Sequence, residues 1–146
     1  MNDIYGFKDE YSFLSNFYPA VVKVMVAWEP IEFPATENGY QASKCACTKD
    51  MLQFVELTPG QAKRLGRKVE IKDNWDDIKV AVMKDLLRQK FNHQHLREKL
   101  LATGDCYIEE TNYWKDTFWG VCDGVGENNM GKLLMEIRNE LKEKQQ

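Results

Sequence analysis

The stretch Pro34-Ala35-Thr36-Glu37-Asn38-Gly39-Tyr40-Gln41-Ala42-Ser43-Lys44 marks the point where an apolar strand pair stops and a helix begins. We expect Thr36 to be the N-cap, because its hydroxyl can accept a hydrogen bond from the first free amides of a helix. Glu37 then lies in the opening turn, where the positive end of the helix dipole stabilises a carboxylate.

One face of this predicted helix carries an unusual set of polar groups. Glu37, Tyr40, Gln41 and Lys44 are spaced three, four and seven residues apart, so they share a face that presents an acid, a phenol, an amide and an amine. Most charged helix faces are solvated, and a surface role is one interpretation. The other is that the face turns inward and forms part of a binding site.

Composition predicts one globular domain that acts on a small molecule. The chain has 146 residues, of which 43% are hydrophobic and 29% charged. A net charge of -3 provides no overall basic field for long nucleic acid. The start of the chain has neither a basic nor an apolar leader, and no run is long enough to span a membrane.

The cysteine and histidine spacings predict neither disulfides nor a metal site. Four cysteines include no CxxC pair, so we expect reduced thiols in a cytoplasmic protein: Cys45, Cys47, Cys106 and Cys122. The two histidines are only two residues apart, at His93 and His95, which disfavours a metal centre. We expect no metal and no cofactor.

Apolar periodicity predicts a helix-rich α+β fold in a single compact domain. We expect a packed loop over 7–19, a hairpin over 21–33 with its turn at Glu29-Pro30, and a short strand over 106–108. Thr58 caps a short helix that ends at Gly66. The other expected helices cover residues 36–47, 49–56, 74–92, 95–103 and 130–144.

Two further segments have the character of site loops. Gly66-Arg67 can hold a phosphate through the planar guanidinium, although the same pair is common at an exposed helix end. Residues 111–131 combine two tryptophans, several acids and several glycines before a helix start, which is typical of a functional loop.

The ordered motifs along the chain resemble those of the NADAR superfamily, including its YbiA-like N-glycosidase branch. The resemblance covers about residues 5–141 and departs at Asn38, where the family often has histidine. The motifs are Phe13-Leu14-Ser15-Asn16-Phe17-Tyr18-Pro19, the Thr36–Lys44 stretch, Gly66-Arg67, Trp75, Met83, Lys90-Phe91, Thr103-Gly104, Asp116-Thr117-Phe118-Trp119-Gly120, and Gly126 to Gly131 through Arg138.

This resemblance implies hydrolysis of the bond between C1 of ribose 5-phosphate and the nitrogen of an amino-pyrimidine, an early riboflavin biosynthesis intermediate. Another branch is implicated in removing ADP-ribose from guanine bases. A non-catalytic module that binds ADP-ribose or a nucleotide is a third interpretation. The expected partner is therefore a small phosphorylated N-riboside, with ADP-ribosylated guanine as the alternative.

The resemblance also assigns candidate residues. Cleaving an N-riboside passes through a sugar cation, which calls for two separated carboxylates, and Glu37 and Asp116 map onto acidic family positions. Lys44 would neutralise a phosphate or attack C1 as a nucleophile. Trp75 is interpreted as core more readily than as a ligand wall. The predicted substrate-binding residues are Asn16, Phe17, Tyr40, Gln41, Arg67, Trp119, Gly120 and Asn128.

Overall fold

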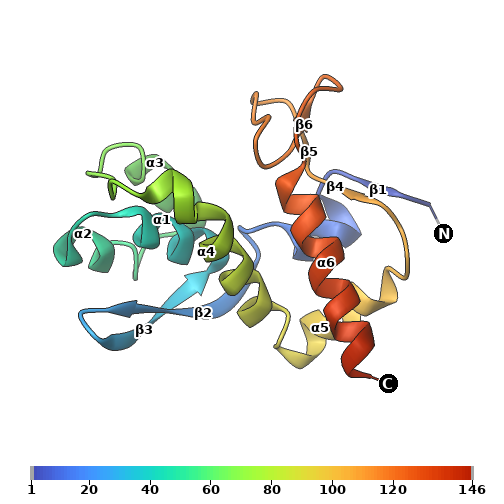
Figure 1. Cartoon of the computed structure of the whole chain (residues 1–146), viewed down its shortest axis with the longest axis horizontal. Coiled ribbons are helices and arrows are strands. Elements are labelled where there is room, and N and C mark those ends of the chain that lie inside the picture. Colours follow the sequence, from blue (N-terminus) through green and yellow to red (C-terminus); the bar gives the residue numbers. More distant parts are fainter. Residues whose placement is uncertain (1, 146) are drawn as a thin grey trace. The chain divides into compact units, whose positions relative to one another are not determined.

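The computed structural model describes residues 2–145, which form two compact units. The hairpin unit is Asn16–Lys90, and the α6 unit combines the residues up to Ser15 with those from Phe91 onward. Helices predominate over short strands in each unit (Figure 1). The predicted helix-rich α+β fold is therefore confirmed.

The hairpin unit begins with two antiparallel strands, β2 (Pro19–Val26) and β3 (Glu29–Ala35). Alternate side chains of the strands are buried, as expected for a sheet with one solvated face. The predicted turn at Glu29-Pro30 is wrong, because Val26 already pairs with Glu29. The turn is Ala27-Trp28, where both residues have positive φ, as a tight two-residue hairpin turn requires.

Helix α1 (Thr36–Lys44) contacts both strands of this hairpin and also α3 and α4 (Figure 1). It comes close to its neighbours at Gly39, where an added Cβ would lie 3.0 Å from Val22 and 3.2 Å from Leu86. The predicted cap is wrong by one residue, since Ala35 is the N-cap and the buried Thr36 hydroxyl has no hydrogen-bond partner. The helix also ends earlier than residue 47.

Three more helices complete the hairpin unit: α2 (Thr48–Leu52), α3 (Pro59–Leu65) and α4 (Trp75–Lys90). Helix α2 is shorter than the predicted 49–56, whereas the Thr58 cap is confirmed as a capping box with Gln61. The Asn38 amide donates to the carbonyls of Phe54 and Leu57 at 2.9 and 2.8 Å. Asn38 therefore ties α1 to the chain after α2.

The α6 unit contains paired two-residue strands, one short 3-10 helix and two α-helices. Strand β1 (Ile4–Tyr5) pairs in parallel with β4 (Ile108–Glu109), and β5 (Thr111–Asn112) pairs in parallel with β6 (Val121–Cys122). The predicted irregular loop over 7–19 instead contains the 3-10 helix η1 (Asp9–Leu14). Helices α5 (Gln94–Ala102) and α6 (Asn129–Lys144) lie within one residue of their predicted bounds.

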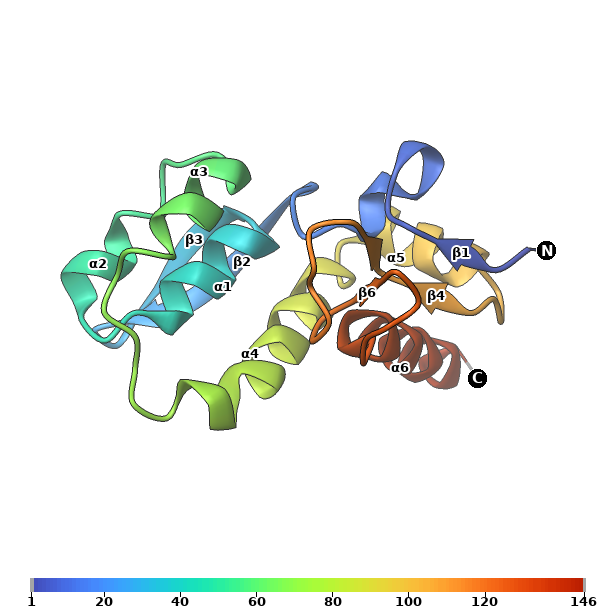
Figure 2. The same cartoon turned by 90° about the horizontal axis from the view of Figure 1, so that it is seen from above.

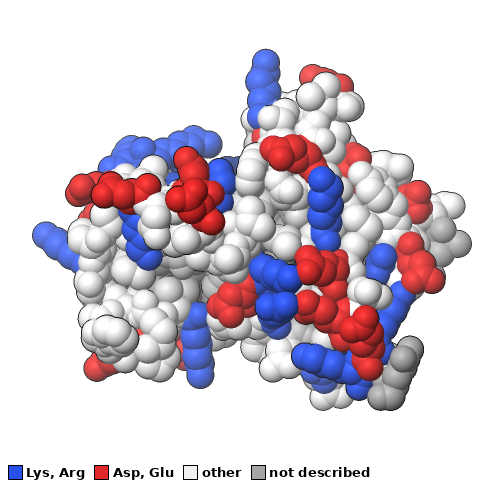
Figure 3. Space-filling view, viewed as in Figure 1, with Lys and Arg blue, Asp and Glu red and all other residues white. Residues whose placement is uncertain are grey.

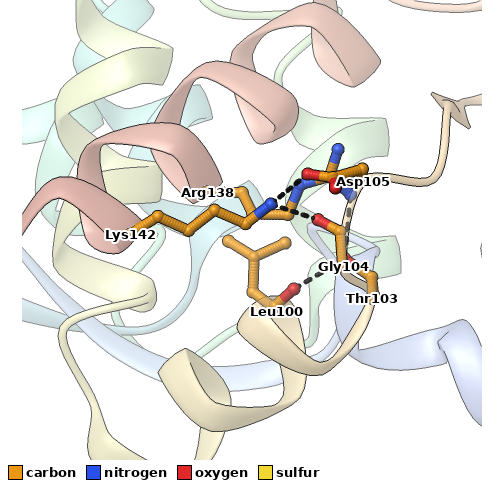
Figure 4. Close-up of polar contacts among 6 residues, drawn as sticks. All are labelled: Leu100, Thr103, Gly104, Asp105, Arg138 and Lys142. Carbon is orange, nitrogen blue, oxygen red and sulfur yellow. Dashed lines mark hydrogen bonds and ion pairs between the residues drawn. The ribbon is translucent and has the colours of Figure 1, made fainter. Parts of the chain in front are cut away.

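A buried polar cluster fastens α6 to the end of α5 (Figure 4). The Arg138 guanidinium donates to the Thr103 hydroxyl at 2.9 Å, and that hydroxyl donates to the Leu100 carbonyl at 2.6 Å. Lys142 adds contacts to the Gly104 carbonyl and to the Asp105 carboxylate. Burial lowers the pKa of Arg138, and its hydrogen bond to the Thr103 hydroxyl offsets part of the cost of burying its charge.

Candidate functional site

Glu37 lies at the buried start of α1. Its side chain is 7% exposed, and the Gln41 Nε2 donates to its Oε1 at 3.3 Å. Its backbone N–H donates to the Asn16 carbonyl at 3.1 Å, so the loop before β2 caps the helix. The acid, phenol and amide of the predicted face are all buried, and the solvated interpretation of that face is wrong.

The Tyr40 side chain packs within the same unit. Its ring lies 5.1 Å from the Trp75 ring, measured between centroids, and both residues are buried. Such tilted aromatic pairs stabilise a core. This packing agrees with the interpretation of Trp75 as a core residue. A contact between Tyr40 and the substrate stays a prediction.

Lys44 ends α1 as a half-buried amine. Burial is the main cause that lowers its pKa, the charge of Arg67 acts in the same direction, and the charges of Glu37 and Cys45 oppose them. A lowered pKa increases the fraction of neutral amine at a given pH, which a nucleophilic lysine requires. The charges of Glu37 and Arg67 thus both act on the Lys44 amine within the hairpin unit.

The loop before β2 holds two further predicted residues. The Asn16 Nδ2 contacts the Met83 sulfur at 3.6 Å, while its buried Oδ1 has no hydrogen-bond partner. Phe17 is 43% exposed, and the Lys63 Nζ lies 5.9 Å from its ring centroid. This loop therefore provides an unused acceptor and an accessible ring.

Helix α3 and the turn after it form a basic corner. We define it by Lys63, Arg64, Arg67 and Lys68, of which all but Lys63 are exposed. Figure 3 shows Lys and Arg side chains gathered over α3. A positive surface of this kind attracts phosphate despite the negative net charge of the whole chain.

One groove of the hairpin unit lies away from these residues. It has a volume of about 640 Å³, runs between β2 and α4, and contains none of the predicted site residues. Gln89 of α4 covers part of the edge of β2 at this groove. Its Oε1 accepts from the Lys23 backbone N–H at 2.7 Å, and its Nε2 donates to the Lys23 carbonyl at 2.9 Å. We do not assign the groove to the candidate site.

In the α6 unit, Asp116 is held in a braced turn. Its backbone N–H donates to the Asn112 Oδ1 at 3.0 Å, and its carbonyl accepts from the Asn112 Nδ2 at 2.8 Å. The Asp116 Oδ1 accepts from the Trp119 backbone N–H at 2.9 Å. The residue is half-buried: the Asn112 side chain holds its backbone, and the Trp119 backbone amide holds one oxygen of its carboxylate.

Trp119 and Gly120 lie in the segment between β5 and β6, and the chain runs on from β6 into α6 (Figure 2). Trp119 is half-buried and meets the Phe118 ring edge-on, with centroids 4.9 Å apart. Its carbonyl accepts from the Met130 N–H at 2.9 Å. An added Cβ at Gly120 would lie 2.1 Å from the Glu110 carbonyl, so only glycine fits there.

Asn128 is buried and bonded to its own unit. Its Oδ1 accepts from the Glu110 N–H at 3.0 Å, and its Nδ2 donates to the Ile108 carbonyl at 2.9 Å and lies 3.3 Å from the Tyr107 hydroxyl. It also adopts a left-handed conformation as the N-cap of α6. These bonds give Asn128 a structural role, and its predicted contact with substrate is untested.

The structure thus groups the predicted residues in two sets. The hairpin unit contains Glu37, Gln41, Lys44 and the others up to Arg67, and the α6 unit contains Asp116, Trp119, Gly120 and Asn128. Sequence reasoning missed the bracing role of Asn112. It also missed that Gly66 lies against the Gln41 side chain, where an added Cβ would be 2.0 Å from the Gln41 Oε1. An asparagine four residues before an acid in a loop is a recognisable turn signal, whereas the Gly66 contact spans two helices and has none.

The comparisons with known proteins address the family. The NADAR domain family model matches residues 5–142. The chain belongs to the NADAR family. The NMR structure of the Escherichia coli protein YbiA matches this NADAR chain with a TM-score of 0.81 and 32% identity, covering 99% of this chain and 89% of that one.

Relatives of this NADAR chain carry enzyme names. It is 34% identical to the N-glycosidase YbiA of Escherichia coli, over 95% of this chain and 87% of that protein. An N-glycosidase of Nostoc punctiforme is also 34% identical, over 95% of this chain and 92% of that protein. A riboflavin biosynthesis protein of Vibrio vulnificus is 37% identical, but this chain spans only 37% of its length.

The remaining features concern thiols, metals and membranes. Cys45, Cys47, Cys106 and Cys122 are all free, as predicted. Within residues 2–145, no group of three or more His, Cys, Asp or Glu side chains is placed to hold a metal ion. No helix in that same range has the length and apolar character to cross a membrane.

Proposed function

We propose that this NADAR chain is an N-glycosidase that hydrolyses ribosylamino-pyrimidine phosphates, the early riboflavin biosynthesis intermediates, and releases ribose 5-phosphate. The observation that carries the proposal is the buried Glu37 carboxylate at the start of α1, held by Gln41 at 3.3 Å. The names of the relatives, N-glycosidase and riboflavin biosynthesis protein, support the same reaction and pathway.

The reaction breaks the bond between C1 of the ribose and the pyrimidine nitrogen. Water adds its oxygen to C1, and its proton goes to the departing nitrogen. Glu37 stabilises the cationic sugar or accepts the proton of the attacking water, and Asp116 performs the complementary proton transfer. The Trp119 backbone amide that donates to Asp116 fixes one of its carboxylate oxygens.

Lys44 offers a covalent variant of the same hydrolysis. Its neutral amine would attack C1 of the ring-opened substrate and form a C1–Nζ imine, and the amino-pyrimidine would leave as its amine. Water then hydrolyses the imine to ribose 5-phosphate and the free lysine. The lowered pKa of Lys44 supports this route, and reduction with borohydride during turnover would trap the lysine adduct for mass spectrometry.

The other predicted residues would bind the substrate. Arg67 is exposed and suited to the phosphate. The Trp119 ring can stack on the pyrimidine, and the unpartnered Asn16 Oδ1 can accept from a ribose hydroxyl. The family match spans both units, which supports a single functional domain, and the four free thiols favour a cytoplasmic setting.

The basic corner favours a second candidate. ADP-ribosylated guanine carries two linked phosphates and, within a nucleic acid, further phosphates nearby. Exposed Arg64, Arg67 and Lys68 could contact several of them. In that case the same carboxylates would release ADP-ribose from guanine.

The test offers both substrates to the purified protein and follows ribose 5-phosphate and ADP-ribose by mass spectrometry. We expect release from the ribosylamino-pyrimidine phosphate, with Glu37→Gln and Asp116→Asn each about 10²–10⁴-fold slower. Matched controls are Glu32→Gln on β3 and Asp123→Asn in the segment 111–131. Both acids are exposed, and their replacement should leave the rate unchanged.

The outcomes separate the alternatives. Release from ADP-ribosyl-guanosine alone would assign the chain to the second candidate. Binding of both compounds without release of either would refute the enzyme and leave a binding module. Equal rates in the control and test variants would refute the carboxylate assignment.

A further inference from the structure

Gly66 ends α3 and lies directly against the side chain of Gln41 on α1. A Cβ built on Gly66 would lie 2.0 Å from the Gln41 Oε1 and 2.6 Å from its Cδ. The backbone of Gly66 is right-handed, with φ of -58°, which any residue adopts. The Gln41 amide therefore occupies the space that a side chain at position 66 would take, and the backbone conformation does not itself call for glycine.

The orientation of the Gln41 amide follows from its other neighbour. The Nε2 of Gln41 donates to the Glu37 Oε1 at 3.3 Å, so the nitrogen of this amide faces Glu37. The oxygen then faces Gly66, where it is buried and has no hydrogen-bond partner. One amide thus links the glycine of one helix to the carboxylate of another.

We propose that Gly66 is a positioning residue for Glu37 and acts through Gln41. The missing side chain at position 66 leaves the space in which the Gln41 amide lies, and that amide holds the Glu37 carboxylate in one orientation. The proposal rests on the proposed function for its effect on the rate, since it concerns how the catalytic carboxylate is aimed.

An alanine at position 66 tests this relation because it changes little else. A normal contact of about 3.4 Å requires the Gln41 oxygen to move by more than 1 Å. The bond from Gln41 to Glu37 is already long at 3.3 Å, and a hydrogen bond beyond about 3.5 Å contributes little. The end of the flexible Gln41 side chain moves, whereas the Ala62 carbonyl of α3, 3.2 Å from the added Cβ, need give by only a few tenths of an ångström.

The experiment compares Gly66→Ala, Gln41→Ala and the double variant. The matched control is Gly60→Ala in the same helix, where an added Cβ meets nothing within 4 Å. We expect Gly66→Ala to lower kcat by about 10-fold or more, part of the effect of a general acid or base, with KM within about threefold of wild type. The double variant should be no slower than Gln41→Ala, and Gly60→Ala should match wild type.

A spectroscopic readout separates this proposal from the proposed function. The carboxyl carbon resonance of Glu37, assigned with Glu37→Gln, should move in Gly66→Ala and Gln41→Ala and stay in place in Gly60→Ala. If wild type cleaves neither substrate, the proposed function fails, and these resonances alone decide the positioning role. An unmoved Glu37 resonance in Gly66→Ala, or rate losses that multiply in the double variant, would overturn it.

Discussion

The turn that holds Asp116 allows a quantitative test through Asn112→Ala. This change removes two bonds between Asn112 and the Asp116 backbone, of 2.8 and 3.0 Å. At about 1 kcal/mol net for each bond, we expect unfolding to require about 2 kcal/mol less. For a chain of this size, that loss lowers Tm by about 4–8 °C.

The same variant should slow the reaction, since the carboxylate of Asp116 loses its fixed orientation. We expect kcat to fall about 10-fold or more, which is less than the loss on removing the acid itself. In the Asp116→Asn background, the additional Asn112→Ala change should cost stability but not rate. Thr111→Ala, an exposed neighbour on the same strand, controls for loss of a side chain.

Urea unfolding, followed by tryptophan fluorescence, measures the free energy of unfolding. Steady-state hydrolysis measures kcat. A lower free energy of unfolding with an unchanged kcat would show that the braced turn stabilises the loop without aiming Asp116. A change in kcat of equal size in both Asp116 backgrounds would show that Asn112 acts on the reaction by some other route. Either result would refute the reasoning.

Three other variants probe separate parts of the chain. Burial lowers the pKa of Lys90 to about 7, so above that pH mainly the unfolded state stays protonated. The free energy of unfolding of wild type relative to Lys90→Met should then rise from pH 7 to 9, by up to about 1.4 kcal/mol per pH unit, and a flat difference in urea titrations would contradict this. Thr103→Val leaves the buried Arg138 guanidinium without its hydroxyl acceptor, so we expect a loss of about 1–3 kcal/mol by urea unfolding, and an unchanged stability would show that water replaces the bond. Arg67→Ala should raise KM for the phosphorylated substrate about 10-fold with little change in kcat, and an unchanged KM would place the phosphate elsewhere.

Local signals in the sequence predicted most of the elements. The Thr58 cap, the glycine after α5 and the apolar stripe of α4 each depend on residues within a few positions of one another. The misplaced hairpin turn shows the limit of such signals. The Ala27-Trp28 turn lacks the usual glycine or asparagine. The turn was predicted at Glu29-Pro30, but Pro30 lies in β3 and pairs with Met25 of β2.

The sequence by itself determined the helix-rich α+β class, the acidic first turn of α1 with its start to within one residue, and the motifs that resemble the NADAR family. These depend on residue order and short-range periodicity, which are visible without coordinates. Only the tertiary structure decided that the polar face of α1 is buried and that Gly66 makes room for Gln41. Burial and the close contact between α1 and α3 depend on residues that are distant in the chain. No pattern among neighbouring residues shows which distant residues meet.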